Sequence, residues 1–222
     1  MSSGAVSAGA GGPVPGRPVV IGITGPIGCG KSQVARWLGE QGAAVIDADA
    51  VARGVTAPGE PAHDEVLRRF GPSVAGADGT LDRAALGRIV FADPARLGEL
   101  EAIVHPAVRT RILAALEAAE RDGVPAAALE AIKLVEGGLA ALCDEVWLIS
   151  CDPAAQRERL TGRGTPPADA EQRIAVQADL ADRLRPTATR VFDTTGEPDG
   201  TRALVVAALG ETLATARRRA PR

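Results

Sequence analysis

The segment that most constrains this chain is residues 25–32, which read GPIGCGKS. Gly at the first and sixth positions followed by Lys and Ser is the G-x-x-x-x-G-K-S pattern of a phosphate-binding P-loop. The backbone N–H groups of such a loop face an anion, and the N-terminus of the following helix adds partial positive charge. The flanks agree with the motif, because 18–24 reads as an apolar strand and the residues after Ser32 have helical spacing.

The motif predicts a nucleotide site with defined roles. We expect Lys31 to reach the outer phosphates and the Ser32 hydroxyl to bind Mg²⁺. The residues expected to hold the nucleotide are Gly25, Ile27, Gly28, Cys29, Gly30, Lys31, Ser32 and Gln33. Only Lys31 and Lys133 are lysines among 25 basic residues. The P-loop accounts for Lys31, whereas Lys133 is either an ordinary surface residue or a point charge that arginine cannot replace.

Apolar runs alternate with helical patterns along the rest of the chain. Strands are expected at 18–24, 43–47, 126–132, 145–149 and 189–193, which predicts an α/β fold with a five-stranded parallel sheet between two helical layers. We expect one P-loop domain over 18–219. A helical insertion at about 60–122 is read as a cap over the acceptor, in which His105-Pro106 bends or restarts a helix. The Gly/Pro-rich break at 162–169 predicts a mobile lid at about 160–180.

Composition argues against several classes of partner. The net charge of −3 predicts no broad basic face for nucleic acid, and no apolar run approaches the ~20 residues of a membrane span. Residues 1–17 read as a disordered tail. The three cysteines are odd in number and unpatterned, so neither a disulfide framework nor a zinc site is expected, and a reducing cytoplasm is the expected compartment. The sequence leaves the oligomeric state open, with a monomer favoured.

Three carboxylates are expected at the ends of strands. Asp47 and Asp49 follow the second strand, where one can accept a proton from an attacking hydroxyl and the other can hold Mg²⁺ through water. Either can instead cap the helix that begins near Ala50. Glu130 ends the third strand, where an acid supports Mg²⁺ in many P-loop proteins, although a surface role stays open.

Arginines gather around the expected lid. Arg159 and Arg163 are placed to neutralise charge on a transferring phosphoryl group, whereas Arg157 can equally be a plain exposed residue. The two histidines fit no hydrolase triad and no metal-ligand spacing. His105 is read as an acceptor contact or a helix-start feature rather than as a base.

Taken together, these segments resemble the dephospho-CoA kinases over about residues 19–213. The most specific matches are Asp47-Ala48-Asp49, the Leu-Glu-x-x-x-His-Pro run at 100–106 and the Gln-x-x-Arg-Leu-x-x-Arg run at 156–163. The resemblance implies ATP-dependent phosphorylation of the ribose 3′-hydroxyl of dephospho-CoA, with no nucleic-acid or membrane partner. It implies Asp49 as the base, catalytic roles for Lys31, Arg159 and Arg163, and metal ligation by Ser32 and Glu130. The implied acceptor contacts are Asp47, Asp49, Arg53, His105, Arg109, Glu130, Lys133 and Glu136.

The chain departs from the family pattern at several positions. Pro26, Cys29 and Gln33 replace the usual Gly, Ser and Thr of the loop, and Lys133 lies where the family has an apolar run with proline. Thr194 replaces an Asn near the last strand, which affects the contacts expected on the adenine side. Two alternatives remain: a related kinase for another nucleotide or sugar, and a nucleotide-binding regulator without an acceptor.

Overall fold

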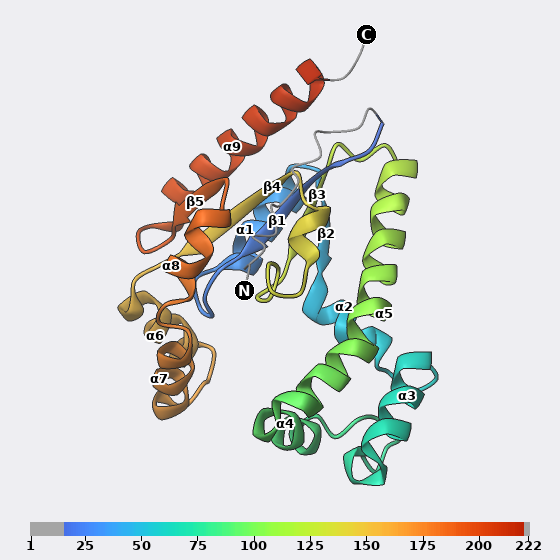
Figure 1. The fold of residues 1–222 in the computed structure, drawn as a ribbon. Coiled ribbons are helices and arrows are strands. Elements are labelled where there is room, and N and C mark those ends of the chain that lie inside the picture. The colour runs from blue at the N-terminus through green and yellow to red at the C-terminus, as the bar shows by residue number, and fades with distance from the viewer. Residues whose placement is uncertain (1–15, 220–222) are drawn as a thin grey trace, which may run out of the picture. The chain divides into compact units, whose positions relative to one another are not determined.

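The structure is a computed structural model that describes residues 16–219 (Figure 1). Its centre is a five-stranded sheet of β1 (Val19–Thr24), β2 (Ala44–Asp47), β3 (Ala126–Glu130), β4 (Glu145–Ser150) and β5 (Arg190–Asp193). The strand order is β2-β3-β1-β4-β5. β1 pairs in parallel with both β3 and β4, and β5 pairs in parallel with β4. The predicted α/β fold and its five strands are therefore confirmed, with ends shifted by one or two residues.

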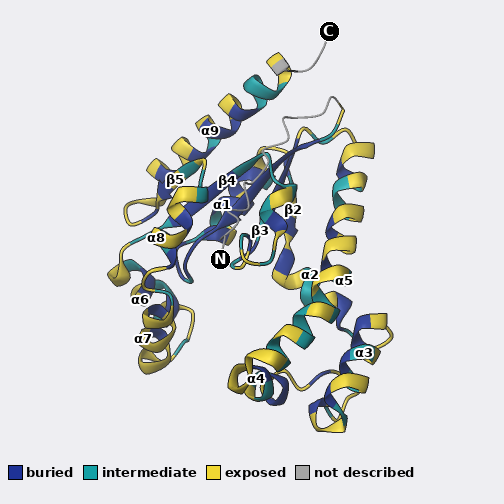
Figure 2. Cartoon of the chain, viewed as in Figure 1, coloured by how far each residue is buried: buried dark blue, intermediate teal, exposed yellow. Residues whose placement is uncertain are grey.

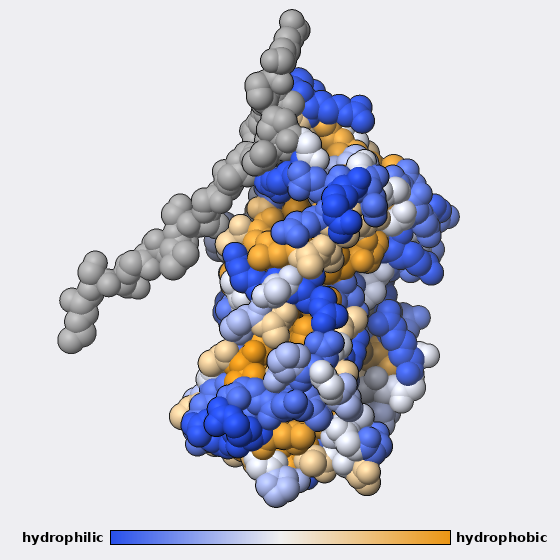
Figure 3. All heavy atoms as spheres, turned by 90° about the vertical axis from the view of Figure 1, so that its right-hand side faces the viewer, coloured by the Kyte–Doolittle hydropathy of each residue, from blue (hydrophilic) through white to orange (hydrophobic). Residues whose placement is uncertain are grey.

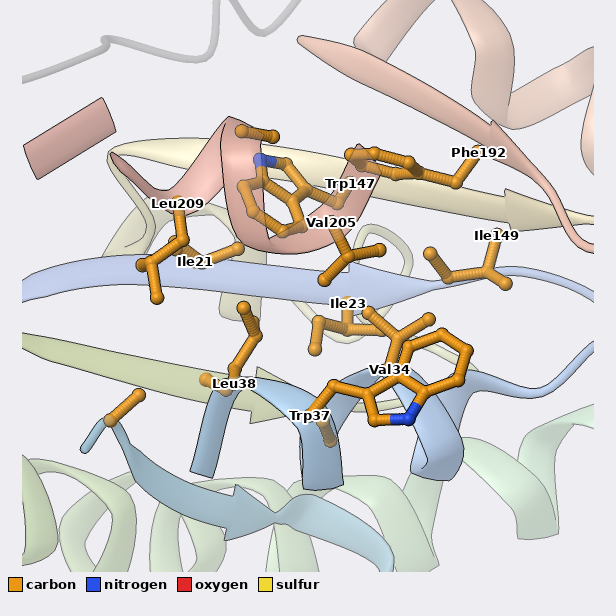
Figure 4. Packing of buried hydrophobic residues seen from close by; sticks show 14 of the residues in the cluster. Ile21, Ile23, Val34, Trp37, Leu38, Trp147, Ile149, Phe192, Val205 and Leu209 are labelled. Atoms are coloured by element: carbon orange, nitrogen blue, oxygen red, sulfur yellow. The ribbon is translucent and has the colours of Figure 1, made fainter. Parts of the chain in front are cut away.

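One face of the sheet packs against α1 (Lys31–Glu40) and α9 (Pro198–Arg219). Figure 4 shows Trp147 of β4 beside Phe192 of β5, with Val34 and Leu38 of α1 approaching from the helical layer. The Trp147 and Phe192 rings lie 5.0 Å apart between centroids. These two large aromatic side chains, with aliphatic neighbours, form a dry core that fixes α1 against β1.

The opposite face is covered by α8 (Leu180–Leu184) and by the segment between β3 and β4, which includes η2 (Leu139–Leu142). Leu148 of β4 packs with Leu180 and Leu184. Gly22 of β1 faces Leu134, and a Cβ at Gly22 would lie 2.6 Å from the Leu134 side chain. This close approach requires glycine in the middle of the strand. α8 is followed by η3 (Arg185–Thr187).

The contacts divide the chain into two compact units. The first contains the sheet and comprises the described residues up to Ile46 and from Leu116 onward. The second, Asp47–Ala115, contains α2 (Ala48–Val55), α3 (Pro61–Phe70), η1 (Pro72–Val74), α4 (Arg83–Ala92) and most of α5 (Pro94–Arg121). Val66, Phe70 and Leu86 form part of its own apolar core. The helical insertion expected at about 60–122 overlaps this unit, which begins earlier, at Asp47, and ends earlier, at Ala115.

Two further helices follow β4. α6 (Pro153–Gly162) and α7 (Pro167–Val176) pack through Leu160, Ala170 and Ile174. Figure 2 shows that their outward surfaces are exposed, whereas the strands of the sheet are largely buried. The Gly/Pro-rich break is the short connection between α6 and α7, inside the segment predicted to be a lid.

One local prediction needs correction, and another is decided between its two alternatives. Residues 1–15 of the expected disordered tail lie outside the described residues, but Arg17 belongs to the fold because its guanidinium pairs with Asp144 at 2.5 Å. Of the two effects considered for His105-Pro106, the structure shows a bend rather than a restart, since Pro106 lies inside α5. Figure 1 shows that α5 changes direction along its length, as expected where proline removes a helical hydrogen bond.

The surface carries both hydrophilic and apolar side chains. On the face drawn in Figure 3, hydrophilic side chains surround smaller apolar patches. No described helix is both long and apolar enough to cross a membrane.

Candidate active site

The P-loop connects β1 to α1 at the carboxyl edge of the sheet. Gly25, Gly28 and Gly30 have φ values of 140°, 80° and 88°, a backbone region that side chains with a Cβ rarely adopt. A Cβ at Gly25 would lie 2.0 Å from the carbonyl oxygen of Ile149, so this position also lacks space for a side chain. α1 begins at Lys31 directly after this turn, and its N-terminal N–H groups therefore face the loop.

Lys31 and Ser32, whose predicted ligands are phosphate and Mg²⁺, form the first two residues of α1. The Lys31 ammonium donates to the carbonyl oxygens of Gly25 (2.9 Å) and Pro26 (3.0 Å), so it folds over the loop. The Ser32 hydroxyl donates to Oε1 of Glu130 over 2.7 Å. Glu130 ends β3, the strand adjacent to β1, and the parallel register brings the two side chains together. The structure thus unites a motif hydroxyl with a strand-end carboxylate that is 98 residues away.

This oxygen pair fits a magnesium ion. Hydroxyl and carboxylate oxygens are hard ligands of the kind Mg²⁺ prefers, and the ion usually takes only one or two protein ligands beside nucleotide phosphates and water. Within residues 16–218, no group of three or more His, Cys, Asp or Glu side chains could hold a metal ion by itself. The donor set therefore suits a metal that arrives with a nucleotide.

A pocket of about 470 Å³ lies beside the loop. Its volume is within the range of small-molecule sites. Four arginines and two acidic residues line it, which leaves an excess of positive charge suited to a phosphorylated ligand. The lining residues are Gly30, Gln33, Arg36, Trp37, Glu40, Arg159, Arg163, Thr194, Pro198, Asp199, Thr201 and Arg202.

Thr194 joins the arginine of α6 to the loop. Its buried hydroxyl donates to the carbonyl oxygen of Cys29 over 2.7 Å. Arg159 donates from Nη1 to the Thr194 hydroxyl over 3.0 Å and from Nη2 to the Thr194 carbonyl oxygen. The residue that departs from the family Asn therefore fixes both the loop backbone and a catalytic candidate. Arg163, the C-cap of α6, is exposed and lines the same pocket.

Two glutamines, one in α6 and one at the end of α7, contact the loop. The Gln156 side chain donates from Nε2 to the carbonyl oxygen of Ile27 (2.8 Å), and Ile27 N–H donates to Oε1 of Gln177 (2.7 Å). Arg157 is exposed and pairs with Glu171 of α7. The Glu171 carboxylate beside it raises the guanidinium pKa further above its usual value.

The cysteines overturn one prediction from the sequence. Cys29 of the P-loop and Cys151, directly after β4, form a disulfide with their Cα atoms 5.2 Å apart. They are 122 residues apart in sequence, and the pairing of β1 with β4 brings the two strand ends together. Cys143 remains a free thiol, and burial raises its pKa to about 12 with a smaller contribution from Asp144. An odd cysteine count without a motif could not reveal this pairing.

Two further acidic candidates, Asp47 and Asp49, lie in the second unit. Asp47 caps α2, because its Oδ1 accepts from Ala50 N–H over 2.9 Å, and its other oxygen lies 3.7 Å from Arg53. The capping role that the sequence left open therefore belongs to Asp47. Asp49 lies in the first turn of α2 with an exposed side chain. Its carboxylate is therefore accessible from solvent.

The other predicted acceptor contacts lie on two segments. His105 and Arg109 are exposed, and their spacing of four residues puts them on the same face of α5. Lys133 and Glu136 are exposed in the turns that follow β3. Nearby, the Thr24 hydroxyl donates to the carbonyl oxygen of Ile132 over 3.1 Å and ties the end of β1 to these turns.

Sequence reasoning missed several pocket residues. Arg36, Trp37 and Glu40 lie on α1, and Pro198, Asp199 and Arg202 begin α9. The helical spacing after Ser32 could have indicated the first group, since residues three or four apart share a helix face. No local signal could indicate the second group, because only the packing of α9 against α1 brings them to the pocket.

Comparisons with known proteins identify a family. The family model described as dephospho-CoA kinase (CoaE) matches residues 19–199. A protein of Symbiobacterium thermophilum named dephospho-CoA kinase is 50% identical over 190 residues, covering 85% of this chain and 79% of that relative. A protein of Synechococcus, also named dephospho-CoA kinase, is 47% identical over 189 residues, covering 83% of this chain and 90% of that relative.

Solved structures share the fold. The structure of TT1252 from Thermus thermophilus matches with a TM-score of 0.74 and 36% identity, covering 88% of this chain and 98% of that chain. A dephospho-CoA kinase from Campylobacter jejuni matches with a TM-score of 0.64 at 22% identity, over 88% of this chain and 98% of its own. With the family model spanning most of the sequence, this chain belongs to the dephospho-CoA kinase family.

Proposed function

We propose that this chain transfers the γ-phosphoryl group of ATP to the ribose 3′-hydroxyl of dephospho-CoA, giving coenzyme A and ADP. The observation that carries the proposal is the Ser32–Glu130 pair beside Lys31, inside a chain of this family. A P-loop together with an acid at the end of a neighbouring strand positions the β- and γ-phosphates of a nucleotide and their metal ion.

The residues of the first unit would bind and orient ATP. The loop N–H groups and Lys31 hold the phosphates, and the arginine-rich pocket accepts the nucleoside. Ser32 and Glu130 would hold Mg²⁺, which supplies neutralisation of charge on the β- and γ-phosphates. Lys31 has to exchange its contacts with the carbonyl oxygens of Gly25 and Pro26 for phosphate oxygens.

The arginines of α6 would stabilise charge that develops on the transferring group. Arg159 is held by Thr194, so its guanidinium is positioned before the nucleotide arrives, which favours electrostatic stabilisation without reorganisation. Arg163 is more exposed and has freedom to close on the phosphates. Thr194 and Gln156 would position the P-loop, because each donates a hydrogen bond to a carbonyl oxygen of its backbone.

Asp49 is proposed as the base that accepts the proton of the 3′-hydroxyl. Asp47 is the weaker candidate because its carboxylate is already engaged by Ala50 N–H and Arg53. His105, Arg109, Lys133 and Glu136 remain proposed acceptor contacts, as the family resemblance implies.

The test is direct. Purified protein is incubated with Mg·ATP and dephospho-CoA, and coenzyme A is followed by mass spectrometry. Asp49→Ala should lose about 10²–10⁴ in rate with ATP binding nearly unchanged, since removal of a general base costs this much. Glu65→Ala is the matched control, because Glu65 is a half-exposed acid of the same unit whose carboxylate pairs with Arg68. Full turnover by Asp49→Ala would refute the assignment of the base.

A further inference from the structure

A second hollow, of about 510 Å³, lies wholly within the unit Asp47–Ala115. Its volume falls in the range typical of small-molecule sites. It is formed by the end of α2, the loop after it and the start of α4. The residues that line it are Arg53, Thr56, Ala57, Pro58, Thr80, Leu81, Asp82 and Arg83.

The charge of this hollow favours an anion. Arg53 and Arg83 contribute two guanidinium groups, and Asp82 is the one acidic residue in the lining. The Asp82 carboxylate is already engaged, because Oδ1 accepts from the N–H groups of Ala84 (3.0 Å) and Ala85 (2.9 Å) and thereby caps α4. The two arginines therefore dominate the hollow, and guanidinium groups match phosphate oxygens in geometry as well as charge.

Arg83 is fixed in place by the fold. Its Nη2 donates to the Thr56 hydroxyl over 3.1 Å and approaches the carbonyl oxygen of Arg53 at 3.5 Å. A guanidinium has five N–H donors, and both contacts use the same nitrogen, so Nε and Nη1 remain to meet a ligand. The buried Thr56 thus presents Arg83 to the hollow with little loss of side-chain freedom on binding.

Arg53 is available to the same ligand. Its side chain is 58% exposed, and its ion pair with Asp47 has a separation of 3.7 Å. Exposed ion pairs of this kind contribute little to stability, so Arg53 can exchange Asp47 for a phosphate at low cost.

The position of Asp49 connects the hollow to the proposed reaction. Asp49 and Arg53 are four residues apart on α2, which places their Cβ atoms about 5–6 Å apart on one helix face. In dephospho-CoA the 3′-hydroxyl and the 5′-diphosphate are attached to the same ribose, only a few bonds from each other. A ribose that offers its hydroxyl to Asp49 would therefore direct its diphosphate one helical turn along α2, toward Arg53 and Arg83.

We propose that the hollow between Arg53 and Arg83 binds the diphosphate of the acceptor, and that Arg83 determines specificity for it. This inference rests on the proposed function, because it names the part of the acceptor that a further site recognises. The consequence is selectivity, because an acceptor that carries the diphosphate can contact both arginines and an acceptor without it can contact neither.

Binding is measured first, by calorimetry with dephospho-CoA in the absence of ATP. Arg83→Ala should raise the dissociation constant about 10- to 100-fold, the loss expected for charged hydrogen bonds to phosphate. The dissociation constant of Arg83→Lys should lie between those of the unsubstituted chain and Arg83→Ala, because lysine keeps the charge and loses the planar guanidinium. Arg88→Ala is the matched control, since Arg88 is exposed on the same helix and does not line the hollow. The control should bind as the unsubstituted chain does.

A selectivity measurement separates recognition from a merely structural role. Adenosine offers the ribose hydroxyl without any phosphate, and both acceptors are assayed with Mg·ATP. Arg83→Ala should lower kcat/KM for dephospho-CoA and leave kcat/KM for adenosine unchanged. Equal losses for both acceptors, or no loss for dephospho-CoA, would overturn the inference.

These outcomes distinguish this inference from the proposed function. Coenzyme A formation with binding that does not depend on Arg83 would overturn the diphosphate site and leave the function intact. Arg83-dependent binding without any product would support the diphosphate site and refute the function.

Discussion

Removal of the Cys29–Cys151 disulfide should destabilise this chain strongly. The two cysteines are 122 residues apart, so the cross-link closes a long loop in the unfolded chain. The chain-entropy relation for a loop of this length gives a stabilisation of about 5 kcal/mol at 25 °C. For a chain of this size, about 2–4 °C in Tm accompanies each kcal/mol, and the expected fall is therefore about 10–20 °C.

The assay is thermal unfolding of oxidised protein against Cys29→Ser, Cys151→Ser and the double variant. Each single change removes the whole cross-link, so the three variants should have the same lowered Tm. Reduction of the unsubstituted chain by dithiothreitol should produce a similar fall and should leave the variants unaffected. This equality distinguishes loss of the cross-link from loss of packing at one cysteine.

Thiol counting provides the independent check. Oxidised protein unfolded without reductant should expose one thiol, from Cys143, and reduced protein should expose three. In the folded chain Cys143 should react slowly at pH 8, because burial raises its pKa to about 12 and little thiolate is present. Three thiols before reduction, or a Tm that reductant does not lower, would refute the reasoning.

Other predictions concern the ion pair at the start of β1 and the P-loop. Arg17→Ala should destabilise the chain by about 1–3 kcal/mol, because the buried Asp144 carboxylate loses a charged partner; circular dichroism melts would show it, and an unchanged Tm would contradict it. Ser32→Ala and Glu130→Gln should each raise the Mg²⁺ concentration needed for turnover, and a double-variant cycle should be non-additive; independent effects would count against a shared metal. Lys31→Ala should weaken ATP binding in calorimetry and lower turnover; a variant with normal rates would invalidate the P-loop assignment.

The strands and the P-loop could be predicted because their signals are local. Three glycines with positive φ and the Lys31-Ser32 pair lie within eight consecutive residues, and each strand appears as a short apolar run. Asp49 also stood out in a local pattern, two residues after the end of β2, and its role as the base stays a prediction. The same pattern left the roles of Asp47 and Asp49 open, and only the hydrogen bond from Ala50 N–H assigned the cap to Asp47.

The sequence by itself therefore determined the fold class, the phosphate-binding loop and the family, since these depend on motifs read within short windows. The tertiary structure alone decided which distant residues meet: Glu130 with Ser32, Thr194 with Cys29, and Cys151 with Cys29. The physical reason is the order of the parallel sheet. It places the ends of β3, β4 and β5 beside the loop that follows β1, and that order is fixed by packing across the whole core.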